Sequence, residues 1–269
     1  MTELLTIILL GIVEGVTEFL PVSSTGHLIL AARFLGYDPA YWELFNIAIQ
    51  PGAILAIVAL YWRTCLTVAS GMVRGEAAAW RFTRNVVVAF LPAAALGVVL
   101  HDAIEALLGS AATAAWALLI GGVAILAVER VAKPGSVRGI AEIPLGTAVG
   151  IGAIQCLALI PGVSRSASTI LGGLLLGVER RTAAEFSFFL GLPTLTGATA
   201  YQLYKHRDAL ASGQGVGLGA IAIGAAVAFV VAVVVVRWFI TIVGKRGFAP
   251  FAWYRIALGA GALLWLFSR

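Results

Sequence analysis

The sequence predicts an all-α polytopic membrane protein built from two inverted-topology repeats. Three observations lead to this prediction. Hydrophobic residues make up 61% of the chain and charged residues only 12%, whereas soluble domains average about 25% charged residues. Several apolar stretches reach the roughly 20 residues that a helix needs to span a bilayer. Two longer apolar stretches are interrupted midway by Pro, Gly and Ser, and they resemble each other.

The first interrupted segment, 3–36, contains "GIVEGVTEFLPVSSTGHLIL" at residues 11–30. Pro21 and the polar run that follows it divide the segment into two half-helices. Non-helical backbone at membrane depth is tolerated only where it lines a cavity inside the protein. We therefore predict a re-entrant helix–loop–helix rather than a full crossing.

The uninterrupted apolar stretches predict about six full transmembrane helices. They lie at 43–62, 83–101, 112–130, 183–204, 216–242 and 248–267.

A second interrupted segment, 143–177, resembles the first. An offset of 141 residues lays Glu14 on Gln155 and Ser23 on Ser164. An internal duplication is the natural explanation. We predict a single membrane domain, 1–269, with repeat 1 at 1–130 and repeat 2 at 143–269, each holding one re-entrant segment and three spans.

Three crossings per repeat is an odd number, so the repeats are inverted and their re-entrant segments meet near the midplane. The basic residues then divide unequally between the two sides. One side holds Arg63, Arg74, Arg81, Arg84, Arg130, Lys133, Arg138, Arg180, Arg181, Lys245 and Arg246, and the other only Arg33, Lys205, Arg207 and Arg269. The positive-inside rule makes the richer side cytoplasmic, with both termini outside and the first re-entrant segment open to the outer face. The net charge of +5 thus indicates topology, and no nucleic-acid partner is expected.

Glu14 and Glu18 lie four residues apart and share one face of the first half-helix. Two carboxylates at close range repel unless a cation lies between them or one is protonated. A divalent metal, a basic partner or a general acid/base role would each explain them. The alternative is that one of them reaches the membrane interface.

Ser23, Ser24 and Thr25 precede the second half-helix and could cap it. Together with two carboxylates and His27 they also fit a nucleophile or a substrate clamp. His27 lies beyond the Pro21 break, so the fold must bring it back to the acids. Its alternative role is to cap the second half-helix.

The second segment contains "PGVSRSAST" at residues 161–169. Arg165 is costly at membrane depth unless it is paired. The backbone N–H groups and hydroxyls at the start of a half-helix suit an anion, and a guanidinium adds a bidentate phosphate contact. The alternative is a structural ion pair between Arg165 and Glu14 or Glu18.

The weaker candidates are polar residues in the other spans. Asn46 and Gln50 could line the cavity or bond across helices. Arg255 could reach the interface or line a site. Cys65 and Cys156 lack metal-ligand spacing, and packing is their expected role.

Two motifs resemble a known family. "EGVTEFLPVSSTGH" and "PGVSRSAST" are similar to the signature motifs of the bacterial undecaprenyl pyrophosphate phosphatases linked to bacitracin resistance. The resemblance extends over nearly the whole chain and includes "LHD" (100–102), "IQCLAL" (154–159), "EFSFFL" (185–190) and "FAPFAWYR" (248–255). Ala167 is a departure, because the family usually has Gly there.

The resemblance implies a multi-pass enzyme of the bacterial plasma (inner) membrane that converts undecaprenyl diphosphate to the monophosphate used in peptidoglycan synthesis. It implies catalytic roles for Glu14, Glu18, Ser24, His27 and Arg165, and substrate-binding roles for Ser23, Thr25, Ser164, Arg165, Ser166 and Thr169. Family activity is stimulated by divalent cations, so Mg²⁺ or Ca²⁺ at Glu14 and Glu18 is expected.

The partners expected are a polyprenyl diphosphate lipid and membrane lipids, and the sequence is compatible with a homodimer. The rival function is a lipid-phosphate carrier or flippase, which would use the same midplane anion site. A flippase would not need paired glutamates beside a serine and a histidine. The sequence therefore favours the enzyme.

Overall fold

The computed structural model describes residues 2–36, 38–207 and 216–268. Within these ranges the chain is almost entirely helical and forms no β-strand beyond an isolated bridge between Val137 and Val178. The helices are α1 (Glu3–Thr17), α2 (Ser24–Leu35), α3 (Pro39–Ala48), α4 (Gln50–Leu60), α5 (Trp62–Val73), α6 (Ala77–Val99), α7 (His101–Leu108), α8 (Ala111–Val131), α9 (Leu145–Gln155), α10 (Arg165–Leu175), α11 (Arg180–Lys205), α13 (Leu218–Arg246) and α14 (Ala249–Phe267), with short 3₁₀ helices η1 (Ile140–Glu142) and η2 (Cys156–Leu159).

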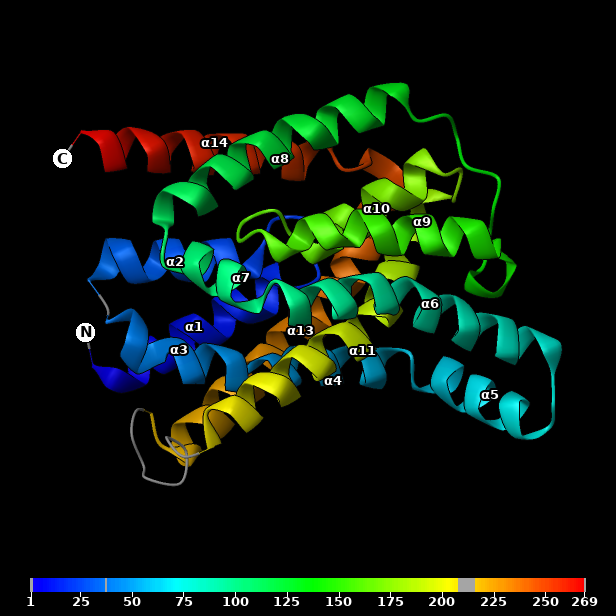
Figure 1. The fold of residues 1–269 in the computed structure, drawn as a ribbon, viewed down its shortest axis with the longest axis horizontal. Helices are drawn as coiled ribbons and strands as arrows, with labels where there is room; N and C mark the ends of the chain where they lie inside the picture. The colour runs from blue at the N-terminus through cyan, green and yellow to red at the C-terminus, as the bar shows by residue number, and fades with distance from the viewer. Residues whose placement is uncertain (1, 37, 208–215, 269) are drawn as a thin grey trace.

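Both interrupted segments are broken where the sequence predicts a break. The first becomes α1 and α2, and the second becomes α9, η2 and α10. None of these helices exceeds the 15 residues of α1, which at 1.5 Å per residue is too short for a hydrocarbon core of about 30 Å. Each segment therefore enters the protein interior and turns back within it (Figure 1).

Four of the predicted spans are long apolar helices, namely α6, α8, α13 and α14. The predicted span 43–62 differs, because it is divided at Ile49 into α3 and α4. Pro51 in the first turn of α4 lacks an N–H group, which weakens the helix at this point. The helix ending at Leu60 then meets α5 at an angle of 75°.

α11 has the length of a span but a lower hydropathy than the other four. It carries Arg180, Arg181 and Glu185 near its start, and Ser187 and Pro193 within it. The helix packs against α4, α6, α10 and α13, so much of its surface contacts protein rather than lipid. A helix in that position can be less apolar than a lipid-facing one.

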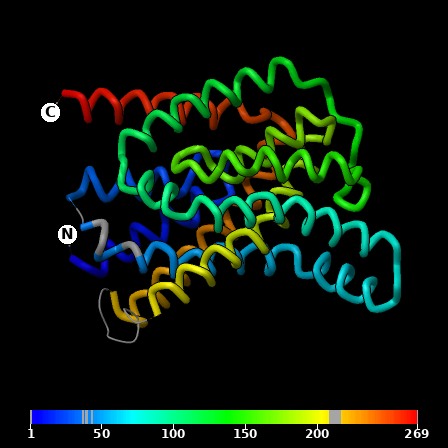
Figure 2. Tube along the Cα trace, viewed as in Figure 1, coloured from blue at the N-terminus to red at the C-terminus, as the bar shows by residue number. Residues whose placement is uncertain are grey.

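Close helix pairs form the body of the molecule. α8 lies along α14, α1 along α13, and α6 along α9 (Figures 1 and 2). The α1–α13 contact depends on glycine, because a Cβ on Gly15 would come within 2.6 Å of the carbonyl oxygen of Ala228. Small residues of this kind allow membrane helices to approach closely.

The starts of α2 and α10 share one backbone geometry at the offset of 141 residues. Ser23 (φ 71°) and Ser164 (φ 80°) are the non-glycine residues with positive φ in the described part of the chain. Each is an N-cap: the Oγ of Ser23 accepts from the N–H of Gly26, and the Oγ of Ser164 accepts from the N–H of Ala167, both at 3.2 Å. At the same offset α1 corresponds to α9 and α6 to α13, so the contact between α1 and α13 has its counterpart in the contact between α9 and α6.

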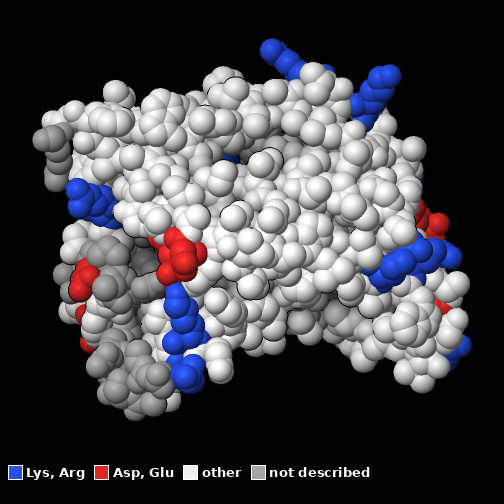
Figure 3. All heavy atoms as spheres, in the orientation of Figure 1, with Lys and Arg blue, Asp and Glu red and all other residues white. Residues whose placement is uncertain are grey.

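The ends of the molecule differ from its middle. Both termini lie at one end, and the α5–α6 turn and the link from α8 to η1 lie at the other (Figures 1 and 2). On the face drawn in Figure 3, most charged side chains lie toward the two ends, with a broad uncharged band between them. Such a band is what a lipid-facing surface requires.

Candidate active site

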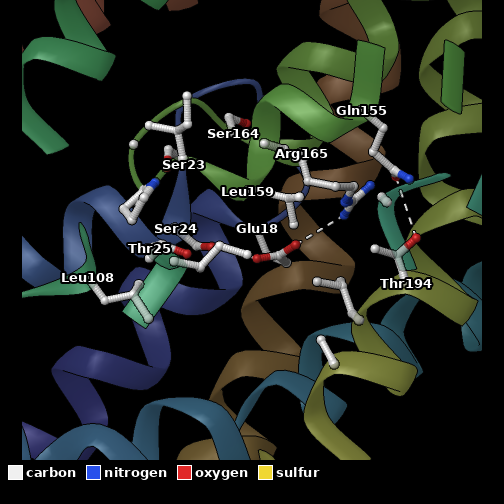
Figure 4. A pocket seen from close by; sticks show the side chains of 18 of the residues that line it. Glu18, Ser23, Ser24, Thr25, Leu108, Gln155, Leu159, Ser164, Arg165 and Thr194 are labelled. Carbon is white, nitrogen blue, oxygen red and sulfur yellow. Dashed lines mark hydrogen bonds and ion pairs between the residues drawn. The ribbon is translucent and has the colours of Figure 1, made fainter. Parts of the chain in front are cut away.

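The loop before α2 and the loop before α10 meet at a cavity of about 230 Å³. Its polar lining comes from both loops and includes Glu18, Ser23, Ser24, Thr25, Ser164 and Arg165 (Figure 4). The first-turn N–H groups of a helix have no partner within that helix. Two helix N-termini therefore border one cavity, which favours a bound anion.

Glu18 connects the two loops. Its Oε2 accepts a hydrogen bond of 2.5 Å from the Oγ of Ser24, and its Oε1 accepts one of 3.0 Å from the Nη2 of Arg165. The Glu18 side chain is only 5% exposed and that of Arg165 only 9%. Figure 4 shows the carboxylate between the hydroxyl and the guanidinium. The sequence left open an ion pair between Arg165 and either Glu14 or Glu18, and in the structure the partner is Glu18.

Arg165 is held from behind by α11. Its Nη1 donates to the carbonyl oxygen of Ser187 at 2.7 Å and to the Oγ of the same residue at 3.2 Å. The Oγ1 of Thr169 and the Oγ of Ser187 lie 2.8 Å apart, within hydrogen-bond distance. The Nε of Arg165 is buried and has no hydrogen-bond partner among the described residues. Ser187 could not be predicted from the sequence, because a serine within "EFSFFL" has no local pattern that marks it.

Ser166 and Thr169 do not line the cavity. Ser166 Oγ donates to the carbonyl oxygen of Leu20 at 2.6 Å, which ties the second loop to the first. Thr169 lies behind Arg165 and donates to its carbonyl oxygen at 2.9 Å. Both were expected to bind substrate, but the geometry makes them supports for the residues that do face the cavity.

His27 points away from the cavity. Its Nδ1 lies 2.7 Å from the carbonyl oxygen of Ser23, and its Nε2 lies 2.7 Å from the hydroxyl of Tyr254. The two rings are stacked, with centroids 5.6 Å apart. His27 is not among the residues that line the cavity, and both of its ring nitrogens already have a partner.

Glu14 is fully buried one helical turn before Glu18. Neither of its carboxylate oxygens has a hydrogen-bond partner within the described residues. A buried carboxylate without a partner is costly. Such a group indicates a proton or a cation at this position.

Comparison with known proteins places the chain. The family model for bacitracin resistance protein BacA matches residues 7–261. The chain belongs to this family. Three relatives, each named undecaprenyl-diphosphatase, align with it over nearly their full length. They come from Novosphingobium aromaticivorans (56% identical, 100% of each chain), Sphingopyxis alaskensis (58%, 99% of each) and Rhizorhabdus wittichii (54%, 99% of each).

In this member of the BacA family, some of the remaining polar residues line the cavity and others do not. Gln50 borders the cavity, and its Oε1 accepts from Thr199 at 3.1 Å. Gln155, which the offset of 141 places opposite Glu14, also borders the cavity, and its Nε2 donates to the carbonyl oxygen of Ala89 at 3.3 Å. Asn46 is not among the lining residues. Arg255 neither lines the cavity nor reaches an interface.

Glu14 and Glu18 differ in how free they are to bind a divalent cation. The Glu14 carboxylate is free, whereas Ser24 and Arg165 already occupy the two oxygens of Glu18. Mg²⁺ is commonly held by one or two carboxylates together with substrate phosphates and water. Of the two acids, Glu14 is therefore the one whose carboxylate has no partner among the described residues.

Proposed function

We propose that this chain is an undecaprenyl-diphosphatase, which removes the terminal phosphate of undecaprenyl diphosphate and leaves the monophosphate carrier for peptidoglycan synthesis. The observation that carries the proposal is the contact series from Ser24 through Glu18 to Arg165. It places a hydroxyl, a carboxylate and a guanidinium together at one cavity. The names of the full-length relatives support the same activity.

The cavity suits both parts of such a substrate. The diphosphate would lie between the N-termini of α2 and α10, where the free Nε of Arg165 offers it a further donor. The rest of the lining is largely apolar and suits an isoprenyl chain. It includes Ala93, Ile104, Leu108, Ala158, Leu159, Ile160, Leu195 and Ala198.

In the chemical step the Oγ of Ser24 attacks the terminal phosphorus and its proton passes to Glu18. The bond from that phosphorus to the bridging oxygen breaks, and undecaprenyl phosphate leaves with the bridging oxygen and the proton from Glu18. Water then attacks the phosphoserine and gives a proton to Glu18, which returns it to Ser24 as inorganic phosphate leaves. Positioning and electrostatic stabilisation supply most of the catalysis in such transfers.

Two other residues act around this step. His27 would hold the first turn of α2 through the Ser23 carbonyl rather than transfer a proton. Glu14, with Glu18, would hold a divalent cation such as Mg²⁺ or Ca²⁺ when phosphate is present. A bound cation would neutralise negative charge on the phosphates.

The cavity would open to the outer face of the plasma membrane, with both termini outside. The support is the unequal distribution of Lys and Arg, since the positive-inside rule assigns the basic-rich end to the cytoplasm. The variant Arg33→Cys, made in a chain without Cys65 and Cys156, tests this orientation when intact cells are labelled with a membrane-impermeant thiol reagent. Protection of that cysteine until the cells are lysed would reverse it.

Phosphate release tests the activity directly. The protein, purified in detergent, should release inorganic phosphate from C55 and C15 isoprenyl diphosphates and not from the matching monophosphates. If it binds these lipids tightly and releases no phosphate, the enzyme proposal fails and the carrier function is favoured.

A further inference from the structure

Arg255, on α14, is the largest fully buried side chain in the described part of the molecule. All five of its N–H groups can be accounted for, and every acceptor is a backbone carbonyl oxygen. Nε donates to Leu118 (3.3 Å), Nη1 to Pro21 (3.0 Å) and Val163 (3.0 Å), and Nη2 to Ala117 (3.0 Å) and Gly162 (2.9 Å).

These acceptors belong to three segments that are distant in the sequence. Pro21 lies in the loop before α2, Gly162 and Val163 lie in the loop before α10, and the other two lie on α8. One guanidinium thus binds both re-entrant loops and fixes them to a long helix. Besides Arg255 and the Glu18–Arg165 pair, the hydrogen bond from Ser166, at the start of α10, to Leu20 also joins the two re-entrant segments.

α8 is shaped to receive this side chain. A Cβ on Gly121 would overlap Nη2 of Arg255, and a Cβ on Gly122 would lie 3.1 Å from its Cβ. The absence of a side chain at Gly121 leaves room for the guanidinium, and that at Gly122 lets α14 approach α8 closely.

The peptide geometry links Arg255 to the cavity. The C=O and N–H groups of a trans peptide point in opposite directions. Because the carbonyl of Val163 faces Arg255, the N–H of Ser164 faces away from it, and Ser164 borders the cavity. Arg255 also has no ion pair among the described residues, so carbonyl dipoles alone balance a cation buried behind an anion site.

We propose that Arg255 is a positioning residue for the phosphatase reaction: it holds the two re-entrant loops in the register that brings Ser24, Glu18 and Arg165 together. It does not touch the cavity and acts through the backbone of both loops. The inference rests on the proposed function for its kinetic consequence but not for the loop geometry itself.

The first test compares Arg255→Lys with Arg237→Lys, an exposed arginine on α13. An ammonium has three donors in place of five, so at least two carbonyls lose their partner. With phosphate release from a C15 diphosphate as the readout, kcat per folded molecule should fall about 100-fold in Arg255→Lys, with a much smaller change in KM, because small misplacements cost about that much. Arg237→Lys should match the wild type.

Folded protein is quantified by gel filtration and thermal unfolding in detergent. A merely structural role predicts that activity falls only in proportion to the folded fraction. An unchanged kcat per folded molecule would overturn the inference, whether total activity is unchanged or falls only with the loss of folded protein.

A coupling measurement asks whether Arg255 acts by joining the loops. Ser166→Ala removes the Ser166–Leu20 bond, so in kcat its effect and that of Arg255→Lys should combine non-additively. Simple additivity would contradict a shared role.

The second test does not depend on activity. Nitroxide labels at positions 33 and 176, at the ends of α2 and α10, are placed in a chain without Cys65 and Cys156. Arg255→Lys should broaden the distance distribution between the labels, and Arg237→Lys should not. If the wild type releases no phosphate, the proposed function fails while this distance test still stands. An unchanged distribution overturns the inference.

Discussion

Replacing Ser24 by Ala separates the two routes by which this cavity could hydrolyse a diphosphate. The change removes the hydroxyl that donates to Glu18 at 2.5 Å. A hydrogen bond to a charged group contributes about 1.5–3 kcal/mol to stability. Ser24 is only 7% exposed, so the loss should lower the unfolding temperature measurably but leave the protein folded.

The effect on rate should be much larger than the effect on stability. If Ser24 is the nucleophile, its loss leaves only binding and electrostatic stabilisation to act on water, and kcat should fall by about 10³-fold or more. Phosphate release from a C15 diphosphate, normalised to folded protein, measures this. Acid quenching with a substrate labelled in its terminal phosphate should trap phosphoserine in the wild type and not in the variant.

Ser168→Ala is the matched control. Ser168 is also buried, and its Oγ donates to the carbonyl oxygen of Ser164 at 3.0 Å, within the first turn of α10 and outside the cavity lining. Its loss should cost about 1 kcal/mol of stability and leave the rate close to that of the wild type. A Ser24→Ala protein that releases phosphate at the wild-type rate would refute the reasoning and make activated water the nucleophile.

Four further outcomes are expected. Arg165→Lys should lower kcat/KM by about 10²-fold, since one ammonium cannot contact Glu18, α11 and a phosphate in the fork geometry of a guanidinium; retention of full kcat/KM would argue against phosphate binding there. Gly15→Ala should lower the unfolding temperature without changing KM, because its Cβ would meet the carbonyl oxygen of Ala228 at 2.6 Å; an unchanged unfolding temperature would contradict this packing. The hydrogen bond from Lys205 holds the pKa of Glu105 below its ordinary value, so the stabilisation is full above the ordinary glutamate pKa and disappears as pH falls through the lowered one. Glu105→Gln should therefore unfold at a lower temperature than the wild type at neutral pH, and the difference should shrink as the pH is lowered into the acid range; a difference that does not change with pH would exclude this pair as its cause. Chelation by EDTA should reduce phosphate release, with recovery on adding Mg²⁺ or Ca²⁺, and unchanged release would remove the cation from the proposal.

Local sequence patterns were sufficient to predict the two broken segments and their meeting point. Pro21 and the Pro161–Gly162 pair lie in the breaks between the half-helices, and Ser23 and Ser164 mark the next helix starts. The offset between the serines is also visible in the sequence. These features depend on neighbouring residues, which a linear reading can assess.

Contacts made across the fold could not be predicted in the same way. Arg255 binds carbonyl oxygens of residues more than 90 positions away. Every residue has such a carbonyl, so the residue type gives no sign that it accepts this bond. Ser187 was missed for the same reason. The bond between His27 and Tyr254 could not be predicted either, because Tyr254 lies on a helix at the other end of the chain.

The two N-cap serines, Ser23 and Ser164, are not the residues that stability alone would favour at their positions. A non-glycine residue at positive φ costs about 1–3 kcal/mol, whereas glycine adopts such angles freely and gives up only a few tenths of a kcal/mol as an N-cap. Glycine would therefore make the more stable protein at both Ser23 and Ser164. The chain instead keeps a hydroxyl at both positions, so the starts of α2 and α10 each carry a backbone strain that folding alone does not require.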